Sequence, residues 1–153
     1  CDIKIYPKYG NASNYLVFEA KGYKAYGQGL DLAVIEPIAN PARANAGSYQ
    51  DLSRYAQEDV DVARKEVLKN DVGERVFVFG YPENGGEIFT EGYNIGYEYY
   101  QGARYLNTSA LVRRGNSGGL AIDSYGNFLG IPTFVRGNIG MILDIDFVMN
   151  QIL

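Results

Sequence analysis

The 153-residue sequence contains no histidine, which removes the commonest general base and the commonest imidazole metal ligand. A mechanism that needs an imidazole must therefore take it from outside these residues. The single cysteine, Cys1, excludes an intrachain disulfide and a structural zinc site of the Cys/His type. No apolar run approaches the roughly 20 residues that a membrane-spanning helix needs.

What the chain does contain suits one globular domain built largely of strands. Its hydrophobic fraction is 46% and its charged fraction is 21%, which is ordinary for a globular protein. A net charge of −4 disfavours nucleic acid as the main partner. Nineteen glycines and fourteen tyrosines, with five prolines and no tryptophan, favour short strands and tight turns.

Short alternating or apolar stretches predict strands along most of the chain, separated by turns rich in glycine and asparagine. The predicted strands are residues 2–6, 15–19, 31–35, 75–80, 88–97, 105–112, 119–123, 128–135 and 140–144. Residues 48–70 are interpreted as a long connection with at most one short helix. Residues 146–153 are interpreted as a closing helix capped by Asp146. Many strands and few helices predict an all-β barrel or sandwich.

The sharpest local motif is RRGNSGG at residues 113–119, in which three glycines flank Ser117. Glycine allows backbone conformations that are closed to other residues, and it lets a second molecule approach the main chain closely. Such a turn can aim two backbone N–H groups into one small space beside a serine, as an oxyanion hole requires. Taken alone, the motif is better explained as a glycine-rich β-turn with an incidental serine.

Five segments, taken in their order along the chain, favour the catalytic interpretation of the motif, because together they resemble one known family. GNSGG is similar to the nucleophile turn of the trypsin-like serine peptidases, and its context resembles the branch that contains the HtrA/Deg and glutamyl-peptidase-like enzymes. The matching segments are residues 29–37, 72–82, 88–96, 105–131 and 140–153. The resemblance implies a chymotrypsin-type fold of two antiparallel β-barrels with an active site between them.

The resemblance also implies a role for individual residues, in the chain order His…Asp…Ser. Ser117 corresponds to the nucleophile, and the backbone N–H groups of Gly115 and Ser117 correspond to the oxyanion hole. Asp31 matches the triad aspartate, although on its own it would be interpreted as a strand-edge acid. No cofactor and no metal are implied, and the family suggests an extracellular or periplasmic location.

The family's histidine lies upstream of the aspartate, and the match suggests that its segment ends a few residues before Cys1. One interpretation is that the base and the missing strands belong to a preceding segment. The other is that the protein is a non-catalytic relative, a peptide-binding or scaffold module. Under either interpretation, we expect residues 1–45 to be the remainder of the first barrel, 46–71 the connection, and 72–153 the second barrel with its helix.

The resemblance places the substrate-binding wall around the nucleophile and along the following hairpin. Its residues are Leu111, Ile131, Thr133, Phe134 and Val135. We expect residues 133–135 to pair with a peptide or protein substrate by strand addition. Because Leu111 is apolar and no acid is evident there, cleavage after Lys or Arg is disfavoured. We expect the substrate residue that precedes the cleaved bond to be small or aliphatic.

Three further groups of residues carry alternatives. Arg113 and Arg114 are interpreted either as cleft residues that favour acidic substrates or as a solvated surface pair. Asp144 and Asp146 are expected to mark a strand end and a helix cap rather than a paired-acid site. The tyrosines of GYEYYQGARY at residues 96–105 could stack sugars or bases, but a structural role in strands is favoured.

Overall fold

The computed structural model describes residues 2–5, 16–26, 31–39, 70–81 and 86–152, which form nine strands and one helix. Strand β4 (Arg75–Gly80) shows why these segments are strands. Val76 and Val78 are fully buried, whereas the alternating Phe77 and Phe79 are only half-buried. Because successive side chains of a strand point to opposite faces, this alternation turns one face to a core. The all-β prediction is confirmed, with one short helix at the end of the described chain.

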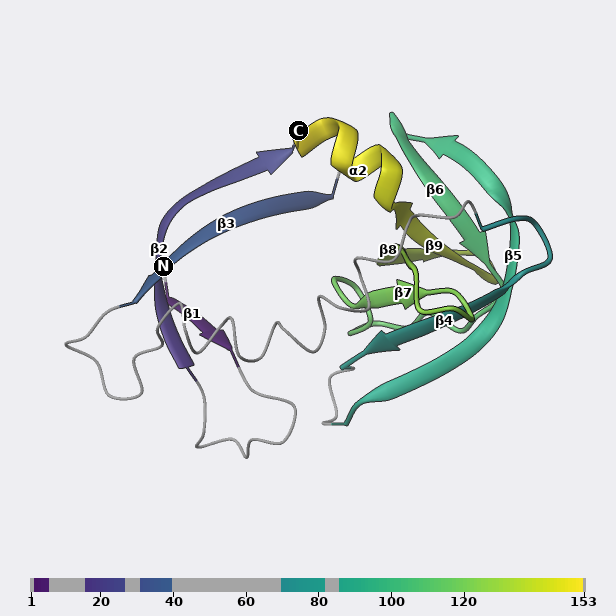
Figure 1. The fold of residues 1–153 in the computed structure, drawn as a ribbon, viewed down its shortest axis with the longest axis horizontal. Helices are drawn as coiled ribbons and strands as arrows, with labels where there is room; N and C mark the ends of the chain where they lie inside the picture. The colour runs from purple at the N-terminus through teal and green to yellow at the C-terminus, as the bar shows by residue number, and fades with distance from the viewer. Residues whose placement is uncertain (1, 6–15, 27–30, 40–69, 82–85, 153) are drawn as a thin grey trace. The chain divides into compact units, whose positions relative to one another are not determined.

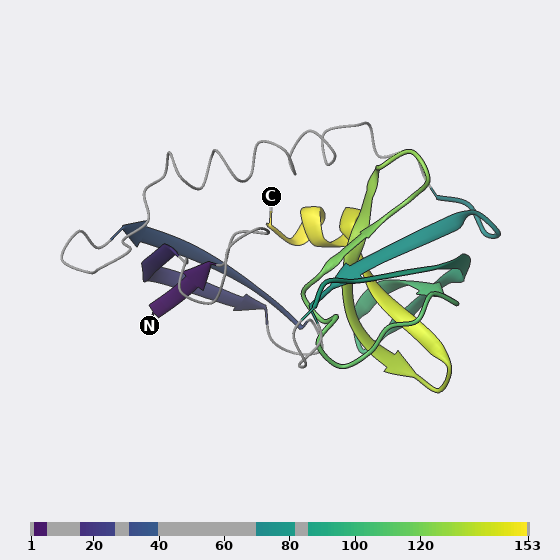
Figure 2. The ribbon, with the colours of Figure 1, turned by 90° about the horizontal axis from the view of Figure 1, so that it is seen from below.

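Six antiparallel strands close into a barrel (Figures 1 and 2). Around the barrel they follow the order β4-β5-β6-β9-β8-β7, in which β7 pairs again with β4. Their bounds are β5 (Ile88–Tyr100), β6 (Ala103–Thr108), β7 (Leu120–Ile122), β8 (Phe128–Arg136) and β9 (Ile139–Asp144). Helix α2 (Ile145–Ile152) follows β9 directly. Closure gives each of the six strands a neighbour on both sides over at least part of its length.

The first part of the chain forms a separate unit, described here by itself. Strands β1 (Asp2–Ile5), β2 (Leu16–Tyr26) and β3 (Leu32–Ala39) form an antiparallel sheet in the order β1-β2-β3. The pairing of β2 with β3 is interrupted by a bulge between Ala20 and Gly22, which lies opposite Pro37 and Glu36. A bulge is one of the few places where a strand accommodates proline, since proline offers no N–H to the ladder.

The barrel interior is filled by small and branched apolar side chains. Val76, Val78, Leu106, Ala121 and Ile142 are at most 1% exposed and belong to one cluster. Burying each of the larger ones stabilises the fold by about 2 kcal/mol relative to leaving it in water. This core fixes the positions of the strand ends from which the loops leave.

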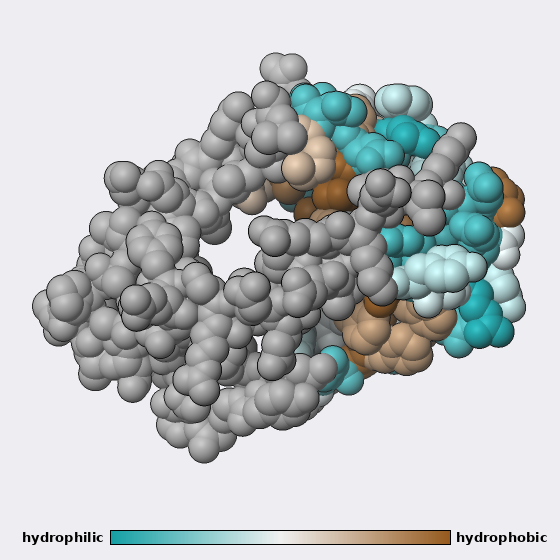
Figure 3. Space-filling view, viewed as in Figure 1, coloured by the Kyte–Doolittle hydropathy of each residue, from teal (hydrophilic) through white to brown (hydrophobic). Residues whose placement is uncertain are grey.

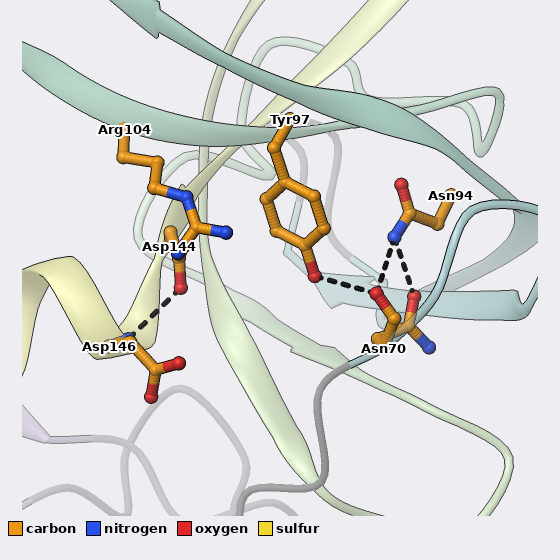
Figure 4. Close-up of polar contacts among 6 residues, drawn as sticks. All are labelled: Asn70, Asn94, Tyr97, Arg104, Asp144 and Asp146. Atoms are coloured by element: carbon orange, nitrogen blue, oxygen red, sulfur yellow. Dashed lines mark hydrogen bonds and ion pairs between the residues drawn. The ribbon is translucent and has the colours of Figure 1, made fainter.

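A polar cluster lies among the side chains of β5, β6 and β9 (Figure 4). Tyr97 donates its hydroxyl hydrogen to the Asn70 carbonyl at 2.8 Å, and the Arg104 guanidinium lies 4.4 Å from the centre of the Tyr97 ring. Asp144 Oδ2 lies 2.7 Å from Arg104 Nη1. That oxygen has no aligned hydrogen-bond donor among the described residues, so the attraction is ionic. Within the tyrosine-rich segment, Tyr97 therefore has the structural role that the sequence favoured.

Burial governs the protonation of this cluster. It raises the pKa of Tyr97 to about 12, with a further contribution from the negative charge of Asp144. Burial also raises the pKa of Asp144, although the Asp146 N–H and the Arg104 charge act in the opposite direction. The Asp144 carboxylate accepts the Asp146 N–H at 3.0 Å, immediately before α2. Asp144 therefore caps the helix, and the prediction of Asp146 as the cap was wrong by two residues.

A second apolar surface lies on the outside of the barrel. Phe77 and Phe79 of β4 both contact Phe89 of β5, with ring centroids 5.6 and 5.1 Å apart. Figure 3 shows a hydrophobic patch over these two strands. The alternation of β4 thus gives valines to the interior and phenylalanines to the outside.

The boundaries of several predicted strands shift in the structure. The segment predicted as 105–112 is a strand only from Ala103 to Thr108, after which the chain runs irregularly to Leu120. Strand β5 extends to Tyr100 and β2 to Tyr26, beyond their predicted ends. The hairpin predicted from the residues around SYGN is present as β7 and β8. Residues 48–69 of the connection predicted at 48–70 and most of the PENGG turn lie outside the described residues.

Candidate active site

The RRGNSGG segment folds into two consecutive turns between β6 and β7. The Asn116 N–H donates to the Arg113 carbonyl, and the Gly119 N–H donates to the Asn116 carbonyl, each at 2.9 Å. The Gly118 N–H donates to the Pro132 carbonyl at 2.9 Å and so connects the segment to β8. These bonds fix the main chain on both sides of Ser117.

Glycine is required at three positions of this segment, for two different reasons. Gly115 and Gly118 have φ angles of 96° and 80°, a region that side chains disfavour. At Gly119 the obstacle is space, because a Cβ atom there would lie 2.1 Å from the Phe79 carbonyl oxygen. The three glycines therefore let the chain turn sharply and pack directly against the end of β4.

Ser117 is exposed at this turn, and its hydroxyl donates to the Thr133 carbonyl of β8 at 2.5 Å. Within the described part of the chain, neither the Gly115 N–H nor the Ser117 N–H donates a hydrogen bond. A hydroxyl beside two uncommitted N–H groups is the chemistry that acyl transfer requires, since the N–H groups can stabilise a developing oxyanion. This arrangement makes the segment a candidate active site.

The predicted substrate-binding residues belong to the same barrel as the turn, and hydrogen bonds from Ser117 and Gly118 connect the turn to β8, which carries four of the five. Leu111 is 49% exposed, and its carbonyl accepts the Thr90 hydroxyl hydrogen at 2.9 Å. Thr133 is buried and donates its hydroxyl hydrogen to the Ile131 carbonyl at 2.9 Å, whereas Val135 is 44% exposed. Among the described strands, β7 pairs with β8 only at Phe128 and Gly130. The backbone at 133–135 therefore has one edge that no described strand occupies.

Phe134 differs from the other wall residues, because its ring is committed to aromatic neighbours. Its centroid lies 5.7 Å from that of Tyr100 and 5.3 Å from that of Tyr105. Arg136, two residues further along β8, lies over the Tyr100 ring and forms two contacts of 2.6 and 2.7 Å with the Glu98 carboxylate. The side chains of Phe134 and Arg136 are therefore held by contacts within the barrel, through Tyr100, Tyr105 and Glu98.

Asp31 and the two arginines complete the account of the predicted residues. Asp31 is exposed and stands immediately before β3, in the three-stranded unit. Its pairing with an imidazole stays a prediction. Arg113 and Arg114 are both exposed, next to the uncommitted Gly115 N–H. Exposure is compatible with either predicted role for the two arginines.

One feature of the turn was missed from the sequence, namely the side chain of Asn116. It is fully buried, and neither Oδ1 nor Nδ2 has a hydrogen-bond partner in the described structure. Gly80 makes room for it, since a Cβ atom at Gly80 would lie 2.6 Å from Asn116 Oδ1. The sequence contained only an indirect signal, the glycine that ends the RVFVFG strand.

Among the described residues, no three His, Cys, Asp or Glu side chains lie together in a way that could hold a metal ion. None of the described helices has the length and hydropathy needed to cross a membrane.

The sequence of the chain is similar to that of known proteins. A family model described as "Trypsin-like peptidase domain" matches residues 13–131. The "Probable periplasmic serine endoprotease DegP-like" of Buchnera aphidicola is 31% identical over 94 residues, which is 54% of this chain and 19% of that protein. An uncharacterized protein, y4bJ of Sinorhizobium fredii, is 40% identical over 67 residues, which is 40% of this chain and 11% of that protein. The chain thus spans less than a fifth of the length of these relatives.

Solved structures show the same fold. The structure described as "HtrA-type protease AlgW with decapeptide" matches with a TM-score of 0.69 and 19% identity, over 98% of this chain and 42% of that one. A serine endoprotease from Yersinia pestis matches with a TM-score of 0.52 and 24% identity, over 59% of this chain and 33% of that one.

Proposed function

Since its residues 13–131 match the family model, the chain belongs to the trypsin-like peptidase family, and we propose that it is part of a serine endopeptidase that acts through an acyl-enzyme on Ser117. The observation that carries this proposal is that Ser117 is exposed while, among the described residues, neither its N–H nor that of Gly115 donates a hydrogen bond. The HtrA-type relatives support the same class of reaction.

In the proposed reaction the Ser117 oxygen attacks the carbonyl carbon of the scissile peptide. An imidazole takes the hydroxyl proton, and the two N–H groups stabilise the oxyanion of the tetrahedral intermediate. The C–N bond then breaks, and the imidazole gives the proton to the leaving amine. Water repeats these steps on the acyl-enzyme and restores the Ser117 hydroxyl. Asp31 orients the imidazole and stabilises its charged form.

The imidazole must come from outside these residues, because the sequence has no histidine. We propose that a segment preceding Cys1 supplies it, together with the strands that complete the first barrel. Without a base the serine hydroxyl is a poor nucleophile near neutral pH. Removal of a triad member leaves roughly 10³–10⁴-fold catalysis over water in enzymes of this type, so the 153-residue chain alone should be nearly inactive.

The substrate is proposed to be an extended peptide that adds a strand to the open edge of β8 at 133–135. The Ser117 hydroxyl donates a hydrogen bond to the Thr133 carbonyl of that edge. A peptide paired with the edge would therefore lie beside the proposed nucleophile. Leu111 and Val135 are the exposed apolar wall residues, which favours a small or aliphatic side chain next to the cleaved bond. The decapeptide named with the AlgW structure supports peptide binding, and the name of the DegP-like relative supports a periplasmic location.

A fluorophosphonate probe tests the proposal, because it reacts only with an activated serine. We expect it to label Ser117 in the protein that includes the preceding segment, and to leave Ser117→Ala unlabelled. The 153-residue chain alone should label at a rate at least about a thousandfold lower, since it lacks the base. Rapid peptide cleavage by that chain on its own would contradict the proposed division of the triad.

A second candidate function is a non-catalytic peptide-binding module that uses the same edge of β8. The observation in its favour is that the Ser117 hydroxyl donates to the Thr133 carbonyl, while the sequence provides no imidazole. This candidate predicts peptide binding by the longer protein without any probe labelling. Peptide binding and probe labelling measured on one sample therefore separate the two functions.

A further inference from the structure

A cavity of about 310 Å³ lies at the start of β4, between residues 70–75, β5 and the turn that joins β7 to β8. Pockets that bind small ligands begin at about 300 Å³, so this one has room for a single side chain. Arg75 lines the cavity, whereas the Ser117 turn is packed against Phe79 at the other end of β4. Four residues of strand, or about 13 Å, separate the two ends.

Two hydrogen-bonded turns form the walls of the cavity. On one side the Asp71 N–H donates to Glu74 Oε2 at 2.8 Å. On the other side the Asp123 carboxylate accepts the N–H groups of Tyr125 and Asn127, each at 2.8 Å. Both walls are therefore in place before any ligand arrives, which lowers the cost of ordering them on binding.

Two exposed tyrosines line the cavity. Tyr93 is 49% exposed and Tyr125 is 70% exposed. Tyr93 pairs with Arg75 across the β4–β5 ladder. Among the described residues, the Tyr93 side chain has neither a hydrogen bond nor a ring contact. Because the face of a tyrosine ring attracts cations, this ring offers a contact that the described structure leaves unused.

The charge around the cavity is negative. Glu74 and Asp123 line it, and the one cation among its described lining residues, Arg75, forms an ion pair with Glu91 at 3.3 Å. Three carboxylates and one guanidinium leave a net charge of −2. Asp123 uses both carboxylate oxygens within its turn, whereas Glu74 Oε1 has no hydrogen-bond partner in the described structure. One carboxylate oxygen therefore remains available to a cation.

We propose that this cavity binds the cationic end of a lysine or arginine side chain from a polypeptide, with Glu74 as its counter-ion and Tyr93 as the ring that it contacts. The net negative charge disfavours an anionic ligand, and an uncharged ligand such as a sugar would not neutralise Glu74. The cavity is too small for a folded element, so the main chain of the partner stays outside it. The site goes beyond the proposed peptidase function and does not depend on it, since its described lining residues include none of the Ser117 turn.

The test measures binding of the peptide acetyl-Ala-Ala-Lys-Ala-Ala-amide to the protein that includes the preceding segment. The protein carries Ser117→Ala, so that the peptide is not cut. In ¹H–¹⁵N spectra we expect saturable shifts of the Gly73 and Ser124 amide signals. The same peptide with an acetylated lysine keeps its length but loses the charge, and it should bind at least about tenfold more weakly. The free amine n-butylammonium should also bind more weakly than the lysine peptide.

Four variants assign the contacts. Tyr93→Leu should weaken binding of the lysine peptide about two- to fivefold, the range of an exposed cation–π contact. Glu74→Gln keeps an oxygen for the Asp71 N–H but removes the charge, so it should weaken binding about threefold, and by less at about 0.5 M salt. Arg75→Leu removes the opposing cation and should strengthen binding about threefold. Tyr99→Leu is the matched control, since Tyr99 is an exposed tyrosine of β5 that does not line the cavity, and it should leave binding unchanged.

Four results would overturn the proposal. The first is the absence of saturable shifts at Gly73 and Ser124. Equal binding of the acetylated peptide would indicate an uncharged ligand, and weaker binding by Arg75→Leu would indicate an anionic one. Equal binding of n-butylammonium would assign the cavity to a free amine rather than to a polypeptide. Failure of the proposed peptidase function leaves all these measurements unaffected, because they are made without the Ser117 hydroxyl.

Discussion

Replacement of Arg104 by leucine gives the most quantitative test of the barrel. The Asp144 side chain is 6% exposed, and Arg104 Nη1 lies 2.7 Å from its Oδ2. Arg104→Leu leaves that carboxylate buried without its counter-ion while keeping its bond to the Asp146 N–H. The variant therefore removes the ionic attraction and preserves the helix cap.

Breaking a buried pair from one side costs roughly 3–5 kcal/mol, because an uncompensated charge stays inside the protein. The Arg104 side chain is 27% exposed, so solvent already screens part of the attraction and the lower end applies. We expect Arg104→Leu to lower the free energy of unfolding by about 3 kcal/mol at pH 7.

The loss should depend on pH in a defined direction. Burial already raises the pKa of Asp144, and removal of the Arg104 charge raises it further. An unfolded aspartate titrates near pH 3.9, so between that value and the higher folded pKa only the folded state holds the proton. Stability therefore falls as pH rises through this window. The deficit of the variant should be smaller near pH 4.5 than at pH 7.

Urea unfolding followed by circular dichroism at the two pH values measures both quantities. Arg75→Leu is the matched control, since Arg75 and Glu91 form an exposed pair at 3.3 Å with side chains 57% and 42% exposed. Exposed pairs contribute about 0–1 kcal/mol, so this control should lose little at either pH. If Arg104→Leu loses no more than the control, or loses the same amount at both pH values, the assignment of a buried charge pair is wrong.

Three further substitutions test other parts of the barrel. Gly119→Ala should destabilise the protein by about 3 kcal/mol or more, because its Cβ would meet the Phe79 carbonyl, and an unchanged thermal midpoint would disprove that close approach. Asp123→Ala removes three hydrogen bonds within the β7–β8 turn and should cost about 2–3 kcal/mol in urea unfolding. Tyr97→Phe should cost about 1 kcal/mol at neutral pH, since it removes the bond to the Asn70 carbonyl. With the pKa of Tyr97 at about 12 and that of an unfolded tyrosine near 10, the unmodified protein should lose stability as pH rises from 10 to 12, and Tyr97→Phe should lose less.

The strands that were predicted best are those whose burial alternates along the sequence. In β4 the residues Arg75–Gly80 alternate between interior and exterior, and the predicted bounds agree with the structure. Where tertiary packing replaces alternation, prediction failed. Residues 109–112 are apolar enough for a strand, yet Ala110 and Val112 are buried there without strand pairing.

The candidate site divides in the same way. The glycines of the turn are predictable, because positive φ angles and close backbone approach leave glycine as the only suitable residue, whereas the role of Ser117 stays a prediction. The unpaired amide of Asn116 is not predictable, because it depends on the space left by Gly80, which is distant in sequence. The prediction of the helix cap failed for a similar reason. Asp144 and Asp146 both fit the local pattern of a cap, and the Arg104 charge lies beside Asp144 only.

The closure of the barrel has a consequence for the kinetics of folding. Strand β7 has three residues, and it joins β4 through pairs such as Phe79 with Leu120, which are far apart in sequence. Contacts of such long range close a large loop, and they tend to form late. The turn that carries Ser117 leads directly into β7 and is packed against Phe79 through Gly119. A partly folded chain would therefore lack an assembled turn, so that Ser117, the proposed nucleophile, would be in place only once the barrel had closed.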